Sequence, residues 1–355
     1  MSRRIAILPG DGIGPEVVGP ACEVLSAAAR QAGEDWTLEI APIGGAAIDE
    51  TGVPLPRQTL SLCQRSDAIL LGAVGGPKWA DVPVAKRPEA GLLRLRSELE
   101  VFANLRPIRI LPALAHQSPL RPDLLDKVDM LVVRELTGGI YFGKQEESDE
   151  AASDLCSYTA PEIRRVVRRA ASFAQQRSGR LTLVDKANVL ATSRLWRRVT
   201  QELIDQEFPD VDLSFEYVDA AAMHLITNPS RFDVIVTENL FGDILTDEAS
   251  VLGGSLGMLP SASLGETSRG LYEPIHGSAP DIAGQNKANP FGAILSTAML
   301  IRLSLGHDAL ATEVEQAVAK CVAAGECTAD IGGSLGTREA GAAMLERFRP
   351  RRQAA

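Results

Sequence analysis

Short apolar runs alternate along the chain with longer segments in which apolar residues recur every three or four positions. The short runs predict strands and the longer segments predict helices, because the two periods match the two backbone geometries. Strands are expected at Ile5–Leu8, Thr37–Ile40, Ala68–Leu71, Met130–Val133, Leu181–Val184, 213–218 and Val234–Val236, with the second and third buried, and helices at 16–32, 91–99, 161–176 and 193–207. The alternation is typical of an α/β protein whose mostly parallel sheet is covered by helices.

The first strand leads into a glycine-rich turn at 9–15, which precedes the first helix. This order is similar to a dinucleotide-binding fingerprint, but Pro15 stands where the third glycine of GxGxxG belongs, so we expect no Rossmann site there. We expect instead a tight turn whose backbone closely approaches another part of the molecule.

Three other regions carry weaker patterns. Residues 138–143 predict a turn into a short strand, and the acidic segment 144–154 predicts an exposed excursion. The C-terminal third is expected to be helical, with glycine-rich loops at 253–257 and 332–336, and the tail at 349–355 is expected to fray.

The composition narrows the possible partners and location. A length of 355 residues suggests two domains or one large α/β unit, and a net charge of −10 argues against nucleic acid or an anionic membrane as a partner. The five cysteines are odd in number and form no CxxC, as expected for reduced thiols in a cytoplasmic protein. The first residues enter a strand at once, so no signal peptide is expected, and the longest apolar run is too short to span a membrane.

Asp243 and Asp247 stand four residues apart in a segment that predicts a helix. This spacing puts both carboxylates on one helix face, with their Cβ atoms about 5–6 Å apart. The apolar stripe of the same helix consists of Ile244, Leu245, Ala249, Val251 and Leu252. Two like charges destabilise a bare helix, whereas a divalent cation such as Mg²⁺ would hold them; the alternative is a solvated face with two ordinary acids.

Lys186, Asp219 and the helix of Asp243 all follow directly after predicted strands. Open α/β sheets bind ligands at these strand ends, so the three features suggest one shared site. Three acids without a convergent histidine or cysteine favour Mg²⁺ or Mn²⁺ over Zn²⁺. Lys186 beside such a metal is a candidate general base, and the alternative is a strand-end lysine in water.

Arginines supply the complementary charge. Arg96, Arg106 and Arg134 carry planar guanidinium forks that match carboxylates, and the last two each close an apolar strand. Together with a metal they would suit a small di- or tricarboxylate, although each alone could be a surface arginine. Tyr141 could donate a proton or simply pack, and the small-residue loop at 273–290 could bring backbone N–H groups to a phosphate or be an ordinary loop.

Taken together, the motifs resemble the decarboxylating β-hydroxyacid dehydrogenases of the isocitrate/isopropylmalate dehydrogenase family. The resemblance covers nearly the whole chain and rests on the segments 8–16, 91–96, 134–143, 185–190, 238–248 and 276–284. It implies a two-domain fold that is not a Rossmann fold. The expected parts are a discontinuous NAD-binding domain at 1–101 plus 255–355, a dimerisation and substrate/metal domain at 102–254 with an arm that includes 141–158, and an active site in the cleft between the domains.

The resemblance also implies an obligate homodimer and a role for each matching residue. The substrate-binding set would be Glu89, Leu92, Leu93, Arg96, Arg106, Arg134 and Val189. The NAD-binding set would be His276, Gly277, Ser278, Ala279, Asp281 and Asn289. Asp243 and Asp247 would hold Mg²⁺ or Mn²⁺ with Asp219 of the partner subunit, Lys186 of the partner subunit would take the hydroxyl proton, and Tyr141 would protonate the enolate.

The implied reaction is NAD-dependent oxidative decarboxylation of an isopropylmalate-type substrate. Leu92 and Leu93 suit an isopropyl group, and the Asp281 carboxylate would repel the 2′-phosphate of NADP. Relatives that act on isocitrate, homoisocitrate or tartrate are the alternatives within the family, and an inactive ligand-binding regulatory subunit is the alternative outside catalysis. The family commonly has asparagine at Ala220 and often an acid at Ala191, and both departures concern fine tuning of the site.

Overall fold

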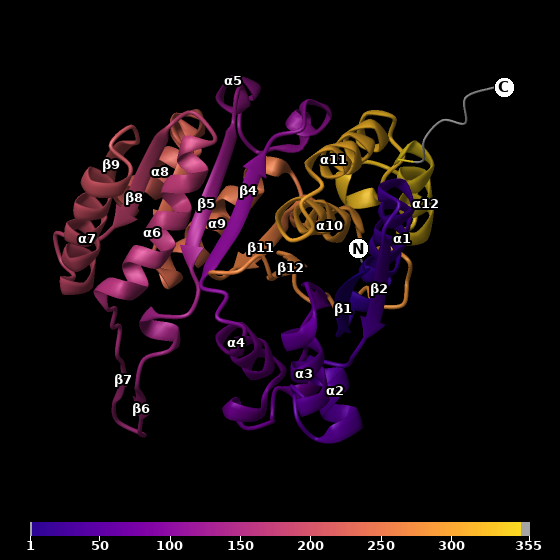
Figure 1. The fold of residues 1–355 in the computed structure, drawn as a ribbon, viewed down its shortest axis with the longest axis horizontal. Coiled ribbons are helices and arrows are strands. Elements are labelled where there is room, and N and C mark those ends of the chain that lie inside the picture. Colours follow the sequence, from indigo (N-terminus) through magenta and orange to yellow (C-terminus); the bar gives the residue numbers. More distant parts are fainter. Residues whose placement is uncertain (1, 349–355) are drawn as a thin grey trace. The chain divides into compact units, whose positions relative to one another are not determined.

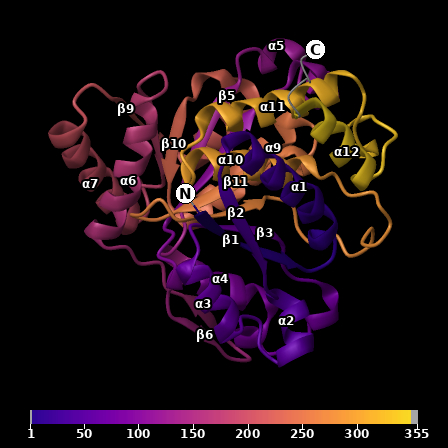
Figure 2. The same ribbon diagram turned by 45° about the vertical axis from the view of Figure 1, so that its right-hand side comes forward.

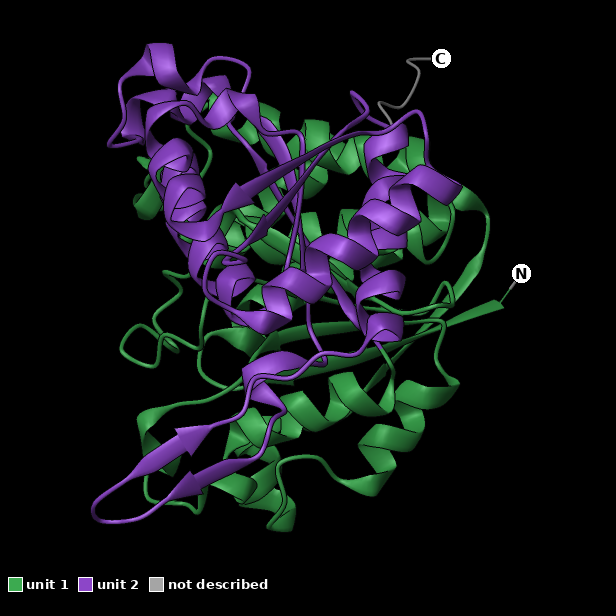
Figure 3. Cartoon of the chain, turned by 90° about the vertical axis from the view of Figure 1, so that its left-hand side faces the viewer, with its two compact units in different colours: residues 1–100, 255–355 green, residues 101–254 purple. Residues whose placement is uncertain are grey.

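The computed structural model describes residues 2–348, so the predicted frayed tail at 349–355 lies outside the described residues. The chain divides into two compact units (Figure 3). Unit 1 comprises Met1–Glu100 and Ser255–Ala355, and unit 2 comprises Val101–Gly254. The cofactor and dimerisation roles expected of the two domains stay predictions.

Unit 1 is an α/β unit built on five strands in the order β2-β1-β3-β12-β11 (Figure 1). Only the β11–β12 pair is antiparallel within it. Its strands are β1 Ser2–Gly10, β2 Asp35–Ile40, β3 Ala68–Ala73, β11 Pro260–Leu264 and β12 Gly270–Pro274. Its helices are α1 Gly14–Ala32, α2 Gly44–Thr51, α3 Arg57–Arg65, α4 Pro88–Glu98, α10 Phe291–Leu303, α11 Asp308–Ala323 and α12 Thr337–Phe348, with short 3₁₀ turns at Pro77–Trp79, Val84–Lys86, Leu256–Met258 and Ala329–Ile331.

Helix α10 is the core helix of unit 1. It is apolar apart from Ser296, Thr297 and Arg302, it is almost wholly buried, and it packs against α1, α11, β11 and β12 (Figure 2). An apolar helix of this kind needs protein around its whole circumference. No helix within residues 2–348 is long and apolar enough to cross a membrane.

Two expectations for unit 1 were wrong. The strand at Thr37–Ile40 forms but is not buried, because β2 pairs only with β1 at the edge of the sheet and Ile40 is 74% exposed. The C-terminal third is not wholly helical, because residues 260–274 form the β11–β12 hairpin. Neither strand of this hairpin, PSASL or GLYEP, contains a β-branched residue, so the composition that usually marks a strand in a sequence is missing.

Unit 2 carries the strand order β4-β5-β10-β8-β9, in which only β4 runs antiparallel to its neighbour. Its strands are β4 Ala103–Arg109, β5 Asp129–Glu135, β6 Gln145–Glu147, β7 Ala152–Asp154, β8 Arg180–Asp185, β9 Asp212–Tyr217 and β10 Val234–Thr237. Its helices are α5 Pro122–Leu125, α6 Ala160–Gln175, α7 Ala191–Glu207, α8 Val218–Thr227 and α9 Asn239–Ser250, with 3₁₀ turns at Pro112–Gln117, Gly139–Tyr141, Pro229–Arg231 and Val251–Gly253. The two units together confirm the α/β class.

The segment that follows β5 differs from the prediction in one respect. Residues 139–141 form a 3₁₀ turn, and the first short strand begins only at Gln145. The exposed excursion at 144–154 is confirmed, because β6 and β7 form a separate hairpin whose residues are all exposed (Figure 3). Ile244 and Val251, which were assigned to the apolar stripe of α9, are also exposed, whereas Leu245, Ala249 and Leu252 are buried.

Candidate active site

Helix α9 presents the two predicted metal ligands. Strand β10 ends at Thr237, and the Glu238 carboxylate accepts a hydrogen bond from the Phe241 N–H at 2.9 Å, which caps the start of the helix. Asp243 and Asp247 follow one helical turn apart. The Asp247 side chain is 70% exposed and that of Asp243 is 33% exposed, so ligands can reach both carboxylates.

Two arginines reach this helix from adjacent strands. In the β4–β5 register Asn104 pairs with Arg134, so Arg106 lies two residues from that pair and shares its face. Arg134 makes an ion pair with Asp243, and Arg106 lies 3.5 Å from Asp243 and 3.4 Å from Asp247. Arg106 is in the middle of β4, not at its end as expected, because the strand continues to Arg109.

Tyr141 completes the group on the 3₁₀ turn after β5. Its hydroxyl donates to Asp243 Oδ2 at 2.7 Å, and the guanidinium carbon of Arg134 lies 5.6 Å from the centre of its ring. Burial and the Asp243 carboxylate raise the pKa of Tyr141. Burial also works to raise the pKa of Asp243, but Arg134, Tyr141 and Arg106 outweigh it and hold that pKa below its usual value. At neutral pH the pair is therefore a protonated phenol beside an ionised carboxylate.

The oxygen donors at Asp243 and Asp247 fit a hard divalent cation such as Mg²⁺ or Mn²⁺. Within residues 2–348, no group of three or more histidine, cysteine, aspartate or glutamate side chains is placed to hold a metal. Asp219 is engaged elsewhere in the chain, with Lys186.

Lys186 and Asp219 form a second group. Strands β8 and β9 are parallel neighbours, so the residues that follow them meet at one edge of the sheet. Lys186 Nζ lies 2.5 Å from Asp219 Oδ1, and its hydrogen bond lowers the pKa of Asp219. The shared site expected from strand ends is therefore realised in part: these two side chains pair with each other, while Asp243 pairs with Arg106, Arg134 and Tyr141.

The remaining predicted substrate residues are on α4 and after β8. Arg96 forms an ion pair with Glu273 at 2.7 Å, and both side chains are largely buried. Leu92 and Leu93 are half-buried, and Glu89 and Val189 are exposed. The pairing of Arg96 with Glu273 was not anticipated, because the two residues are 177 positions apart in the sequence.

The predicted NAD loop packs against the glycine-rich turn of the first motif. The Ile13 N–H donates to the Ser278 carbonyl at 2.8 Å, and a Cβ on Gly12 would lie only 2.0 Å from that oxygen. With a φ of +56°, Gly12 is the residue that permits this approach. The close contact predicted for the turn is therefore confirmed, and its partner is the loop that carries the predicted NAD-binding residues.

Within that loop, burial lowers the pKa of His276, and its Nε2 is buried without a hydrogen-bond partner among residues 2–348. An unpaired buried nitrogen is the kind of group that a bound ligand satisfies, so the loop fits a cofactor. Asn289 is buried and donates to Asp330 at 2.9 Å. Gly277 and Asp281 are exposed, Ser278 is buried, and Ala279 has a φ of +36°.

Two carboxylates in the first motif, which bind backbone N–H groups of neighbouring segments, were not identified from the sequence. Asp11 is buried and accepts the backbone N–H groups of Gly45, Ala46 and Gly75 at 2.7–2.8 Å. Glu16 accepts the N–H groups of two residues in the predicted NAD loop, at 284 and 286. Their place inside the motif at 8–16 was the available signal.

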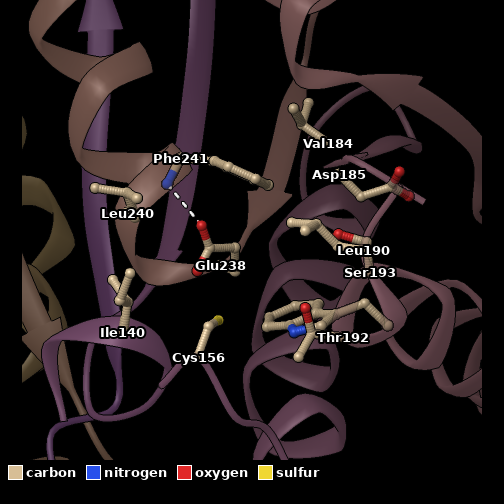
Figure 4. A pocket seen from close by; sticks show the side chains of 11 residues that line it. Ile140, Cys156, Val184, Asp185, Leu190, Thr192, Ser193, Glu238, Leu240 and Phe241 are labelled. Atoms are coloured by element: carbon tan, nitrogen blue, oxygen red, sulfur yellow. Dashed lines mark hydrogen bonds between the residues drawn. The ribbon is translucent and has the colours of Figure 1, made fainter. Parts of the chain in front are cut away.

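Unit 2 also contains an apolar cavity of about 160 Å³. Residues from the turn at Ile140, the start of α7 and the start of α9 line it (Figure 4). None of the predicted site residues lines it, although several adjoin it in sequence. This cavity is therefore not the candidate active site.

Comparison with known proteins agrees with the motifs. The family model described as isocitrate/isopropylmalate dehydrogenase matches residues 4–344. The 3-isopropylmalate dehydrogenases of Geobacillus kaustophilus and Rhodopirellula baltica are 58% and 54% identical, over 94% and 98% of this chain and 91% and 99% of their own.

Solved structures agree as well. The isocitrate dehydrogenase of Methylococcus capsulatus has a TM-score of 0.87 at 34% identity, covering 98% of this chain and 100% of its own. A beta-decarboxylating dehydrogenase of Thermococcus kodakarensis, in its apo form, has a TM-score of 0.80 at 37% identity, covering 98% and 96%. With sequence, fold and motifs in agreement over nearly the whole chain, this protein belongs to the isocitrate/isopropylmalate dehydrogenase family.

Proposed function

We propose that the chain catalyses the NAD-dependent oxidation and decarboxylation of 3-isopropylmalate to 4-methyl-2-oxopentanoate and CO₂, a step of leucine biosynthesis. The observation that carries the proposal is the convergence of Arg106, Arg134, Tyr141 and Asp243 in unit 2. Two cationic forks, a phenol and a carboxylate in one place match an anionic substrate that must lose a carboxyl group and gain a proton. Relatives named 3-isopropylmalate dehydrogenase at 53–58% identity favour this substrate over that of the isocitrate dehydrogenase at 34%.

The side chains suggest how the substrate is bound. The forks of Arg106 and Arg134 would take its carboxylates, and Arg96 would exchange or share its contact with Glu273 to join them. Leu92 and Leu93, half-buried on α4, would face the isopropyl group. A third substrate carboxylate left unpaired against these leucines would cost several kcal/mol, so isocitrate should be a poor substrate.

Three groups would divide the chemistry. Lys186 of the partner subunit would accept the C2 hydroxyl proton while the C2 hydride passes to NAD. The bond to the departing carboxylate then breaks, and its electron pair becomes an enolate, which Tyr141 protonates at carbon. Mg²⁺ or Mn²⁺ held by Asp243 and Asp247, with Asp219 of the partner subunit, would supply Lewis-acid stabilisation of the charge on oxygen when bound.

A homodimer is part of the proposal. Large apolar side chains are exposed on α8 and on the adjoining α9 segment, where a monomer would leave them in water: Met223, Ile226, Ile244 and Val251. Such surfaces mark protein interfaces, and self-association through one patch gives a twofold dimer. The five free cysteines fit a reducing, cytoplasmic location.

The test is turnover of the purified chain with 3-isopropylmalate, NAD and Mg²⁺ or Mn²⁺, followed by NADH absorbance and by release of CO₂. We expect a kcat/KM at least about a hundredfold higher than with isocitrate, from a penalty of about 3 kcal/mol. Equal or better turnover of isocitrate, homoisocitrate or tartrate would show that 3-isopropylmalate is not the preferred substrate. Binding without turnover of any of these acids would favour a regulatory ligand-binding role.

A further inference from the structure

Asn239, the first residue of α9, is 2% exposed and lies behind both Arg134 and the turn that carries Tyr141. We propose that Asn239 is a positioning residue that fixes the Arg134 guanidinium and the Tyr141 turn in one geometry through opposite ends of its side-chain amide. The inference rests on the roles proposed above for Arg134 and Tyr141, and it adds which residue holds these two side chains in a fixed relative position.

The amide oxygen orients Arg134. It accepts hydrogen bonds from Arg134 Nε at 3.1 Å and from one terminal nitrogen at 2.8 Å. These two bonds fix the plane of the guanidinium group, and they leave the other terminal nitrogen directed at Asp243. A guanidinium group held on one side by an amide presents its remaining terminal nitrogen to an anion without further rotation.

The amide nitrogen holds the turn. Asn239 Nδ2 donates to the Gly138 carbonyl at 3.1 Å, directly before the 3₁₀ turn Gly139–Tyr141. The same turn then delivers the Tyr141 hydroxyl to Asp243 Oδ2 at 2.7 Å. One side chain thus binds the arginine through its acceptor and the tyrosine-bearing backbone through its donor, which few other side chains can do at once.

Tyr158 closes the turn from the other side. Its hydroxyl accepts the Asn239 backbone N–H at 3.0 Å and donates to the Glu238 carboxylate at 3.2 Å. A Cβ on Gly138 or Gly139 would lie only 2.7 or 2.3 Å from Tyr158, so side chains are excluded from both positions. Glu238 itself borders the cavity and is anchored by the Phe241 N–H (Figure 4). The turn is therefore clamped between Asn239 and Tyr158.

The substitution Asn239→Asp separates the two functions of the amide. It keeps the shape and an oxygen for Arg134, but it removes the donor and places a carboxylate oxygen against the Gly138 carbonyl. The hydrogen bonds to Arg134 should survive. The hydrogen bond to the Gly138 carbonyl should be lost, so the turn that carries Tyr141 should become more mobile. A displacement of about 1 Å at a reacting group can lower the rate on the order of a hundredfold.

The kinetic test is a double-mutant cycle of Asn239→Asp with Tyr141→Phe. We expect Asn239→Asp to lower kcat about 30- to 100-fold while KM for 3-isopropylmalate changes less than about threefold, because only the step that uses Tyr141 is affected. In the Tyr141→Phe background the same substitution should change kcat less than about threefold. Additive losses in the double variant, or a loss confined to KM, would overturn the proposal.

Asn104→Asp is the matched control. Asn104 is equally buried and its Oδ1 accepts from Arg106 Nε at 2.9 Å, so the same substitution is made beside a neighbouring arginine. We expect its effect on kcat to multiply with that of Tyr141→Phe. If Asn104→Asp and Tyr141→Phe were as non-additive as Asn239→Asp and Tyr141→Phe, the cycle would report general disruption of the site. The specific role of Asn239 would then be refuted.

Amide hydrogen exchange tests the clamp without turnover, so it separates this inference from the proposed reaction. In the ligand-free protein, Asn239→Asp should speed exchange of the 137–143 amides about tenfold or more, while Asn104→Asp leaves them unchanged. Tyr158→Phe, which deletes only the hydroxyl, should speed the same amides and keeps the test available if Asn239→Asp fails to fold. Unchanged exchange in these variants would refute the clamp even if 3-isopropylmalate is turned over, and faster exchange would support it even if the true substrate is another acid.

Discussion

Replacing Arg134 with lysine keeps a positive charge beside Asp243 but removes the planar fork. The Arg134 side chain is only 6% exposed, and it bonds to Asn239 through two nitrogens while it pairs with Asp243 through the third. A lysine ammonium is a compact donor that cannot hold this three-way geometry on a flexible stem. The substitution therefore tests whether the planar shape of the Arg134 guanidinium group is needed when the positive charge is kept.

The expected loss follows from the bonds. Hydrogen bonds that involve a charged group contribute about 1.5–3 kcal/mol each, and a lysine ammonium would keep only about one of the two bonds that the planar fork would make to a substrate carboxylate. A loss of about 2–3 kcal/mol of substrate binding corresponds to about a 30- to 150-fold fall in kcat/KM, at tenfold per 1.4 kcal/mol. Most of this fall should appear as a higher KM, whereas the bonds lost to Asn239 should appear as a lower free energy of unfolding.

The assay is steady-state kinetics with 3-isopropylmalate and NAD, with thermal unfolding measured in parallel. Arg109→Lys is the control, because Arg109 is on β4 and its side chain is 72% exposed, so both measurements should stay near wild type. An Arg134→Lys variant with kcat/KM within about threefold of wild type would show that the planar fork is not used, and the proposed binding mode would be refuted.

Three further perturbations each test one group. Asp247→Asn should lower activity with Mg²⁺ or Mn²⁺ by orders of magnitude, because an anionic ligand is lost, and a wild-type enzyme that stays fully active after exhaustive chelation would contradict the metal requirement. Asp281→Lys should shift the kcat/KM preference from NAD toward NADP, and a wild type that uses both equally would disprove the role of Asp281. Burial works to raise the pKa of Asp233, but hydrogen bonds from Ser178 and Arg177 outweigh it and hold that pKa below its usual value. The Asp233 carboxylate should therefore stabilise the fold at pH values above the pKa of an unfolded aspartate, about 3.9, and lose this contribution as the pH falls through its folded pKa. The unfolding free energies of wild type and Asp233→Asn, measured in urea, should differ by about 2–4 kcal/mol at pH 7 and converge in acid. A difference that grows in acid would contradict this expectation.

Most of the fold could be predicted from local pattern. Continuous apolar runs such as Ala68–Ala73 became fully buried strands, and helices with a clear apolar stripe formed within a few residues of their expected ends. The β11–β12 hairpin could not be predicted, because its strands contain no β-branched residue and are held by pairing within the sheet. The exposure of β2 was missed for a similar reason, since a sequence does not show which strand lies at an edge.

Some contacts of the candidate site could likewise be predicted from the sequence, and others could not. The meeting of Lys186 with Asp219 follows from parallel strands ending at one edge, which is a rule that needs no coordinates. The meeting of Arg106 with Asp243 depends on the antiparallel register of β4, and the pairing of Arg96 with Glu273 depends on contacts between distant segments. No sequence pattern reports such geometry.

The central claim is that two groups of side chains in unit 2 serve one reaction from different subunits. One group is the pair Lys186 and Asp219, and the other surrounds Asp243 and Asp247. Lys186→Met and Asp247→Asn homodimers should each be nearly inactive, because every site lacks one part. In a mixed dimer one site would carry both lesions and the other none, so random exchange from equal amounts should leave about a quarter of all sites intact. The decisive measurement is the activity recovered when the two variants are unfolded and refolded together. We predict about a quarter of wild-type activity, and a mixture that stays inactive while its subunits demonstrably exchange would contradict the shared site.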